Sequence, residues 1–540
     1  MAKSIPLLFL TIAALLLSLP HQSVSLRNPS YLGFVVNATQ LPPEEYYDYI
    51  VIGGGTAGCP LAATLSEKYK VLVLERGGVP YGNPDLMTQE GYLTALTDVD
   101  AFDSPVQAFT SEEGVPNARG RVLGGSSTIN AGFYSRADGE FYLRSGIDWD
   151  MRLVNQSYEW VERLIVFRPE LRSWQMAVRD GLLEAGIDPY HGFSLEHVLG
   201  TKIGGSTFDP TGRRHISADL LSYANPSNIR VALHATAERI LVKKHTAAGV
   251  VFRDRTGRYH HAMVRGKGEV LLAAGALGTP QILLLSGIGP RPYLSSLGIP
   301  VTLHSPHVGQ FLFDNPRNGI SIVPPLPLGH SLVQVVGITS SGAYLEAVSN
   351  VIPLSSPSPH PFFAGNPYSP PVYYRTVATI LEKVIGPTSA GSLRLASTDA
   401  RMNPLVNFNY FNDRGDLERC VNGTRKIGEV LRTSSMEAFK FTQWFGGRDF
   451  AYVGPALPED QSNDALMEEF CRQTVSTIWH YHGGCVVGKV VDGDFRVVGI
   501  ESLRAVDGSI FTVSPGTNPQ ATLLMLGRYV GMKMLRERMW

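Results

Sequence analysis

The chain has 540 residues, which is more than a single hydrophobic core normally fills, so we expect two or more domains. Hydrophobic residues make up 44% of the sequence and charged residues 18%, as in ordinary globular proteins. The formal net charge of -1 provides no basic surplus for binding nucleic acid or an anionic membrane surface. We therefore expect a small-molecule partner and no nucleic acid.

The N-terminus has the pattern of a secretory signal peptide. Lys3 precedes a largely apolar run from Leu7 to Leu19, and Ser23 and Ser25 have the small-x-small spacing of a cleavage site. The apolar run is short for a bilayer span, and a retained anchor is the alternative. We expect residues 1–25 to be removed. The mature chain, without a membrane span, would be secreted or reach another secretory-pathway compartment, such as the cell wall or vacuole.

Three sequons for N-linked glycosylation agree with secretion. They begin at Asn37, Asn155 and Asn422. Such triplets also arise by chance, so we expect that at least one of them is glycosylated.

The four cysteines allow three full disulfide connectivities in an oxidising compartment. Cys59 falls at the start of an expected helix and Cys485 in a glycine-rich stretch, so we expect both to be buried thiols. By elimination, we expect Cys420 to pair with Cys471.

Residues 49–75 have the pattern of a dinucleotide-binding unit: a strand, a glycine turn, a helix and a second strand. The apolar run 49–52 is typical of a buried parallel strand, after which Gly53 allows a tight turn. Gly55 lets backbone amides approach a pyrophosphate, and Gly58 permits close packing of the helix on the strand. The phosphates would lie at the helix N-terminus, where free N–H groups favour negative charge. A structural glycine-rich turn is the alternative.

An acidic residue, Glu75, ends the second apolar run, residues 71–74. Its carboxylate can accept hydrogen bonds from ribose hydroxyls. A carboxylate at this position would repel a 2′-phosphate. The unit therefore favours FAD or NAD over NADP.

The segments around this unit are poor in regular patterns. Residues 26–45 are polar and predict no element, and residues 77–116 predict irregular loops. Residues 119–133 are rich in glycine and hydroxyl side chains. This stretch could wrap a phosphate or a flat ring, or it could be a tight structural turn.

Three later segments have helical patterns. Apolar spacing predicts a helix over residues 174–182 that stops near Gly186. Pro280 lies near the start and Gly287 near the end of a short expected helix. Residues 416–431 are also helical in character.

Strands are predicted over residues 228–233, 239–243 and 269–273. Residues 353–371, by contrast, hold seven prolines, too many for a helix or a central strand. We expect a surface or pocket-lining loop there. The chain has no internal repeat or low-complexity linker, which suggests domains that are interleaved rather than consecutive.

The candidate chemistry lies late in the chain, in residues 479–485 (Trp-His-Tyr-His-Gly-Gly-Cys) and around Asn518. His480 and His482 could provide a base, a metal pair or buried structural residues. A full ligand set is not evident nearby, so we expect no metal. These residues alone leave a catalytic base and a structural pair both open.

Four segments, in this order, together resemble the glucose-methanol-choline (GMC) flavin oxidoreductases. They are the fingerprint at Gly53, residues 119–133, residues 275–290, and His480 with Asn518. The amino-acid sequences of residues 50–60 and 479–485 are most similar to the plant branch of the family, which holds the HOTHEAD proteins and the (R)-mandelonitrile lyases. The resemblance covers nearly all of the mature chain.

The resemblance implies an α/β fold in which a Rossmann-type FAD-binding domain is interleaved with an α+β substrate-binding domain. The FAD-binding domain would comprise residues 46–150, 200–300 and 476–540. The substrate-binding domain would comprise residues 151–199 and 301–475. We expect a monomer.

The resemblance also implies which residues hold FAD. Some relatives tether FAD through a histidine where this chain has Ile129, which has no nucleophilic nitrogen, so we expect non-covalent FAD. By position, the cofactor-binding residues would be Gly53, Gly55, Thr56, Ala57, Gly58, Glu75, Arg76, Val122, Ser126, Asn130, Ala131, Gly132, Phe133, Ala237, Trp479, His480, Asp507, Gly508, Pro519 and Gln520.

His480 matches the family's catalytic histidine. It would take the proton of a substrate alcohol while hydride leaves the carbon for the flavin. Asn518 would donate a hydrogen bond to the developing alkoxide. His482 is expected to be structural.

The lyases of this fold are the alternative, because they split a cyanohydrin into an aldehyde and HCN without net redox chemistry. They carry a second histidine where this chain has Asn518, a tyrosine where it has Ile478, and a pocket cysteine, whereas residues 309–413 contain no cysteine. Some oxidases of the family also carry histidine at the Asn518 position, so that difference alone is weak evidence. Together the three departures favour alcohol oxidation, and an FAD-binding protein without catalysis is a third possibility. Similarity to the HOTHEAD side suggests long-chain hydroxylated lipids, but no residue identifies the alcohol.

Overall fold

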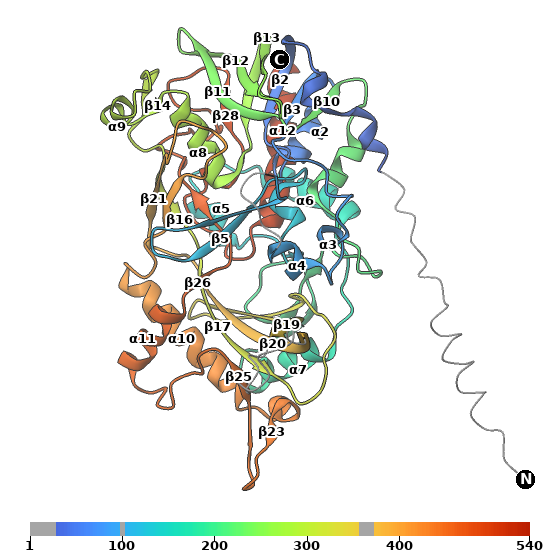
Figure 1. Ribbon diagram of the computed structural model, residues 1–540, viewed down its shortest axis with the longest axis vertical. Coiled ribbons are helices and arrows are strands. Elements are labelled where there is room, and N and C mark those ends of the chain that lie inside the picture. Colours follow the sequence, from blue (N-terminus) through green and yellow to red (C-terminus); the bar gives the residue numbers. More distant parts are fainter. Residues whose placement is uncertain (1–28, 98–102, 356–371, 540) are drawn as a thin grey trace, which may run out of the picture.

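The computed structural model describes residues 29–97, 103–355 and 372–539. The expected signal peptide, residues 1–25, lies outside the described residues, as does most of the proline-rich stretch. Figure 1 shows two large sheets, one in the upper half of the molecule and one in the lower half, and the chain passes between them more than once. No helix in these ranges is long and apolar enough to cross a membrane.

The upper sheet contains the strands expected around the glycine turn. Residues 49–52 of β2 pair in parallel with β3 on one side and β13 on the other, and β3 is buried along its whole length. Strands buried in this way read as continuous apolar runs. The sheet order is β1 (Val35–Asn37), β10 (Ile229–Leu233), β3 (Val71–Leu74), β2 (Glu44–Ile52), β13 (Tyr259–Leu272), β12 (Thr246–Arg253) and β11 (Thr236–Lys243), with β28 (Leu503–Ala505) beside β13.

Two helices from opposite ends of the chain pack together beside this sheet. They are α2 (Gly58–Leu65) and the C-terminal helix α12 (Gln520–Met539). A Cβ on Gly527 would lie 2.2 Å from the carbonyl oxygen of Ala57, so the helices meet at backbone level. Helix α6 (Met151–Ile165) packs against α12.

The expectation of no element in residues 26–45 is wrong. The segment contains a 3-10 turn, Ser30–Phe34, and β1, which adds a parallel edge strand beside β10. A strand of this length has too few residues to show a period, and its place is decided by its distant partner. Residues 77–116 are likewise more regular than expected, with α3 (Pro84–Met87), α4 (Tyr92–Thr97), β4 (Val106–Thr110) and the start of β5 (Pro116–Gly120).

The lower sheet is largely antiparallel. One of its faces is covered by α7 (Ser173–Glu184) and α10 (Arg414–Leu431), which confirms both expected helices. The long strands β19 and β20 form its centre, and β17 pairs with β20. The order is β25 (Ala451–Val453), β17 (Pro316–Val323), β20 (Val372–Val384), β19 (Ala343–Ser355), β18 (Val335–Ile338), β8 (Gly200–Ile203) and β7 (Tyr190–Phe193), with β26 (Ser476–Thr477) beside β17.

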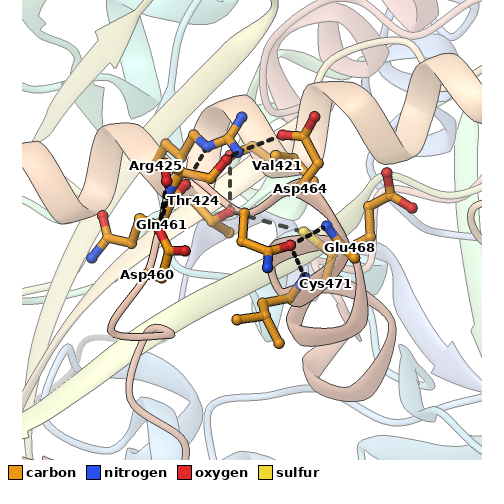
Figure 2. A network of polar contacts seen from close by, with 12 residues as sticks. Val421, Thr424, Arg425, Asp460, Gln461, Asp464, Glu468 and Cys471 are labelled. Atoms are coloured by element: carbon orange, nitrogen blue, oxygen red, sulfur yellow. Dashed lines mark hydrogen bonds and ion pairs between the residues drawn. The ribbon is translucent and has the colours of Figure 1, made fainter.

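A disulfide between Cys420 and Cys471 joins α10 to α11 (Asp464–Thr474), and this confirms the expected pairing. Cys59 and Cys485 are free and buried, also as expected. Figure 2 shows the polar contacts that accompany the disulfide: Arg425 of α10 donates to the carbonyl oxygen of Gln461 at 2.7 Å and pairs with Asp464. The disulfide and these polar contacts thus fix α11 to α10, which covers one face of the lower sheet.

Two prolines do not lie where the sequence pattern places them. Pro280 is inside α8 (Gly275–Leu285) rather than near its start, because the helix begins five residues earlier, directly after β13. Pro353 belongs to β19 rather than to a loop. Since β18 pairs with β19 only from Tyr344 to Glu346, Pro353 lies beyond that ladder, where a missing N–H is tolerated.

Most of the remaining elements are short. The hairpin of β23 (Phe441–Thr442) and β24 (Arg448–Asp449) projects from the lower end of the molecule (Figure 1). The other small sheets pair β4 with β5, β6 (Phe133–Tyr134) with β9 (Gly205–Ser206), β14 (Ile288–Gly289) with β15 (Leu303–His304), and β16 (Gln310–Phe313) with both β21 (Gly391–Arg394) and β27 (His482–Gly483); β22 (Leu405–Asn407) pairs with β21. The remaining short helices are α5 (Gly139–Arg144) and α9 (Arg291–Ser296).

Candidate active site

A cavity of about 790 Å³ is lined by residues of both sheets, which is within the usual range for small-molecule sites. It brings together nearly all of the expected site residues from distant parts of the chain. Gly58 and Val122 are the two that do not line it. The residues that do are Gly53, Gly55, Thr56, Ala57, Glu75, Arg76, Ser126, Asn130, Ala131, Gly132, Phe133, Ala237, Trp479, His480, Asp507, Gly508, Asn518, Pro519 and Gln520.

The glycine turn is as tight as the sequence pattern predicts. Gly53 has φ +109°, and a Cβ there would lie 2.4 Å from the carbonyl oxygen of Ala273. A Cβ on Gly58 would lie 2.0 Å from the carbonyl oxygen of Gly53. The role of Gly58 is therefore in packing α2 against the turn, and larger side chains at either position would obstruct the turn itself.

The carboxylate of Glu75 is buried beside this turn. Its two oxygens accept hydrogen bonds from the backbone N–H groups of Gly54 at 3.0 Å and Gly77 at 2.8 Å. Burial raises the pKa of Glu75, and these backbone donors oppose that shift. A carboxylate has about four lone-pair sites, so each oxygen can still accept a hydroxyl of a ligand.

Two arginines give this end of the cavity positive charge. Arg76 follows Glu75, and Arg119 lies at the end of β5. Arg119 donates from Nε to Gln107 at 3.1 Å, but its buried Nη2 has no partner among the described residues. A buried donor without a partner indicates a ligand acceptor. The sequence pattern did not single out Arg119, because an arginine before a glycine-rich loop has no distinctive spacing.

The loop at 126–133 is connected to the start of α12. Asn130 donates to Oε1 of Gln520 at 2.6 Å and accepts from the backbone N–H of Gly132 at 2.9 Å. Gln520 in turn donates to the carbonyl oxygen of Phe133 at 3.4 Å. The N-terminus of a 20-residue helix therefore lies at this wall, where its dipole favours electron-rich ligand atoms.

Asp507 fixes another part of the wall. Its carboxylate accepts from the backbone N–H of Gly275 at 2.8 Å, from the Thr279 hydroxyl at 2.5 Å and from the backbone N–H of Ser509 at 2.8 Å. These bonds tie the start of α8 to the segment after β28.

His480 and Asn518 meet in the cavity wall. The amide nitrogen of Asn518 lies 3.5 Å from Nε2 of His480, and Nδ1 of His480 is buried without a partner among the described residues. Burial lowers the pKa of His480 well below its usual value of 6.5, and the charges of Lys383 and Arg317 act in the same direction. The imidazole is thus held neutral, as a general base requires.

A buried carboxylate that the sequence analysis did not select, Asp314, holds the backbone of His480. It accepts from the His480 N–H at 2.9 Å, and its other oxygen accepts from the hydroxyls of Thr477 at 2.6 Å and Tyr410 at 2.5 Å. Burial raises the pKa of Asp314 to about 6, against the opposing effect of these donors.

Tyr344 of β19 orients Asn518 from the other side. Its hydroxyl lies 3.5 Å from Oδ1 of Asn518 and 3.0 Å from the Thr517 hydroxyl. Donation from Tyr344 to the amide oxygen leaves the amide nitrogen of Asn518 directed at His480. No local pattern reveals this contact, because it joins the two sheets.

His482 does not line the cavity. Its ring stacks on Phe313 with centroids 5.1 Å apart, and its Nδ1 lies 3.0 Å from the carbonyl oxygen of His480. In the described part of the chain, no group of three or more histidine, cysteine or acidic residues could hold a metal ion. Ile478 lines the cavity, whereas Cys59, Cys485 and the disulfide do not.

Comparison with known proteins identifies the family. Residues 47–317 and 387–527 match the N- and C-terminal family models described as GMC oxidoreductase. The chain is a GMC oxidoreductase.

The relatives of this GMC oxidoreductase are named for different activities. It is 64% identical to an "(R)-mandelonitrile lyase-like" protein of Arabidopsis thaliana, with 98% of this chain and 97% of the relative covered. It is 52% identical to (R)-mandelonitrile lyase 1 of Prunus serotina, with 94% and 90% covered. It is also 49% identical to sinalpyl alcohol oxidase Nec3 of Nesocodon mauritianus, with 94% and 92% covered.

A solved structure confirms the fold. Formate oxidase of Aspergillus oryzae, solved to examine FAD modification, superposes with a TM-score of 0.75 at 20% identity, covering 92% of this chain and 99% of that one. The cofactor of the family is FAD, and the cavity fits it. The glycine turn leaves room only for backbone, Glu75 retains acceptor sites, and the unpartnered nitrogen of Arg119 can meet a phosphate oxygen.

Proposed function

We propose that this GMC oxidoreductase oxidises an alcohol, with His480 as the base. The observation that carries the proposal is the convergence of His480 Nε2 and Asn518 Nδ2, 3.5 Å apart, in the wall of the cavity. An alcohol oxygen placed about 3 Å from both atoms would meet one proton acceptor and one hydrogen-bond donor. FAD, when bound, accepts the hydride that leaves the carbinol carbon.

Two residues would act on the substrate oxygen, one as a proton acceptor and one as a hydrogen-bond donor. His480, neutral because of burial, takes the hydroxyl proton at Nε2. Asn518 donates to the oxygen as negative charge develops there, an interaction worth about 3 kcal/mol when the donor is preorganised. Asp314 and Tyr344 hold these two side chains in place, and Glu75, Arg76 and the glycine turn would hold the nucleotide part of FAD without a covalent bond.

Cleavage of a cyanohydrin, as in the (R)-mandelonitrile lyases, is the second candidate. It is favoured by the 52% identity to a lyase of Prunus serotina. Against it stand Asn518 and Ile478 in the cavity wall, where the lyases carry histidine and tyrosine, and the absence of cysteine from the described cavity lining. Alcohol oxidation requires none of those three groups.

We further propose that the chain is secreted and carries N-linked glycan. The side chains of Asn155 and Asn422 are exposed, although both lie in helices, and Asn37 lies at the end of β1. Sequons are modified before the chain folds, so helical placement does not exclude them. A loss of mass after enzymatic deglycosylation of the secreted protein is expected, and an unchanged mass would contradict glycosylation.

Anaerobic mixing of the purified holoenzyme with alcohols and, separately, with mandelonitrile tests the proposed reaction. Alcohol oxidation predicts bleaching of the flavin absorption by an alcohol with formation of the aldehyde. Release of benzaldehyde from mandelonitrile while the flavin stays oxidised, with no alcohol able to bleach it, would establish the lyase instead.

A further inference from the structure

One face of the lower sheet forms the substrate side of the cavity. Strands β17, β20 and β19 each contribute alternate residues to it, as expected where one sheet face packs on helices and the other does not. The lining residues from these strands are Arg317, Gly319 and Ser321 of β17, Val377, Thr379 and Leu381 of β20, and Glu346, Val348 and Asn350 of β19.

Glu346 is an unusual residue for such a wall. The side chain is 2% exposed, its Oε1 is buried without a partner, and no hydrogen bond or ion pair joins its carboxylate to any other described residue. Leaving a buried carboxylate without donors is costly unless something else supplies them. Because Glu346 lines the cavity, a ligand can supply them.

Two cations lie near this carboxylate: Arg317 lines the same cavity, whereas Lys383 of β20 does not line it. Arg317 donates from Nε to the Ser476 hydroxyl at 3.1 Å, and its guanidinium lies 5.6 Å from the centre of the Trp479 ring. In the described parts of the chain Arg317 has no ion pair within 4.0 Å. Burial lowers the pKa of Arg317, and the negative charge of Glu346 opposes this shift. The two side chains are therefore close enough to interact through space.

The position of Glu346 along β19 separates it from the reacting centre. Tyr344, two residues earlier on the same face, reaches Asn518 with its hydroxyl. Residues i and i+2 of a strand are about 7 Å apart. Glu346 therefore lies about 7 Å along β19 from Tyr344, the residue whose hydroxyl contacts Asn518.

We propose that Glu346 and Arg317 form a specificity site for a second hydroxyl group on the substrate, so that the enzyme acts on hydroxylated alcohols such as phenolic alcohols rather than on plain hydrocarbon alcohols. Glu346 accepts the hydrogen bond of this hydroxyl and Arg317 donates to its oxygen. This inference rests on the proposed oxidation of an alcohol. A hydroxyl group fits because it is both donor and acceptor, whereas a hydrocarbon chain would leave the Glu346 carboxylate without a hydrogen-bond donor.

Binding of two redox-inactive ligands, phenol and anisole, tests the site independently of turnover. The two differ in one hydrogen-bond donor and little in size. Titration calorimetry on the oxidised holoenzyme should show phenol bound roughly tenfold or more tightly than anisole, since hydrogen bonds to charged groups are the stronger class. Glu346→Leu should abolish this preference, and Glu346→Gln, which keeps the shape and a neutral acceptor, should reduce it several-fold.

Glu382→Gln is the matched control. Glu382 is also a fully buried glutamate without partners, on β20, but it faces Gly423 of α10 on the opposite side of the sheet. This variant should keep the preference for phenol. If Glu346→Leu does not fold, Glu346→Gln decides the question, with an unchanged flavin spectrum as the criterion of an intact site.

The inference is overturned if the wild-type enzyme binds phenol and anisole equally, or if the preference is undiminished in the folded Glu346 variants. The proposed oxidation fails separately, if no alcohol bleaches the flavin. When alcohols do bleach it, a KM for 4-hydroxybenzyl alcohol no lower than that for benzyl alcohol would also contradict the hydroxyl site.

Discussion

The amide nitrogen of Asn518 lies 3.5 Å from Nε2 of His480, at the wall of a cavity that both sheets line. The side chains come from the segment after β26 and the segment before α12. A third residue, Tyr344 of the lower sheet, contacts the amide oxygen of Asn518 at 3.5 Å. The orientation of the pair therefore depends on how the two sheets are assembled, and this dependence leads to the predictions below.

Replacing Asn518 by alanine should lower kcat about 100-fold with little change in KM, because the amide acts on charge that develops in the transition state. Steady-state kinetics with the best alcohol measures the split. Asn350→Ala is a suitable control, since Asn350 also lines the cavity but lies on β19. This variant should affect KM more than kcat. A rise in KM at constant kcat in Asn518→Ala would assign Asn518 to ground-state binding instead.

The pH dependence of kcat/KM should have no acid limb near neutrality. Burial and the nearby charges of Lys383, His482 and Arg317 lower the pKa of His480 well below 6.5, so the imidazole stays neutral, and able to accept a proton, as pH falls from 8 to 6. Activity should fall only toward pH 6 and below, first as Asp314, whose pKa burial raises to about 6, becomes protonated, and then as His480 does. An acid limb with its midpoint at 6.5 or above would show that the base is not this buried histidine.

Asp314→Asn should lower kcat roughly 10- to 100-fold while leaving flavin content unchanged, because misplacement of a catalytic group by about 1 Å has effects of this size. The carboxylate accepts from the His480 N–H and from two hydroxyls, and an amide cannot accept at both ends. Tyr410→Phe removes one of these donors but leaves the bond to His480, so its loss of kcat should be smaller. Equal losses in the two variants would mean that Asp314 acts through general stability.

Replacing Cys420 and Cys471 by serine should lower the free energy of unfolding by about 4 kcal/mol, since the disulfide closes a loop with a sequence separation of 51. Urea unfolding followed by fluorescence measures the change. Cys59→Ser, at a buried free thiol, is the control and should have a smaller effect. An unchanged unfolding midpoint in the double variant would show that the polar contacts of Figure 2 suffice to join α10 and α11.

Local patterns predicted the strand–turn–helix–strand geometry of residues 49–75 well. Gly53, Gly58 and Glu75 lie within one strand–turn–helix–strand unit, and their spacing in the sequence is enough to predict the local structure. The disulfide followed from the sequence by eliminating the two buried thiols. Short elements such as β1 were missed because a strand of that length has no period to detect.

The residues that support the proposed catalytic pair could not be predicted in this way. Asp314 is separated from His480 by 166 positions, and Tyr344 from Asn518 by 174. The first contact lies beside the pairing of distant strands, β16 with β27 and β17 with β26, and the second joins β19 to the segment before α12. No local spacing encodes either one. His480 and Asn518 themselves were found through resemblance to a family, and the partner groups around them only through the structure.

The central claim is that His480 removes the proton of an alcohol while FAD is reduced, and the rate of anaerobic flavin bleaching tests it most directly. Stopped-flow absorbance with one alcohol, comparing the wild-type enzyme with His480→Ala, should show a rate lower by about 10² to 10⁴ in the variant at equal flavin content. Undiminished bleaching in His480→Ala would contradict the claim.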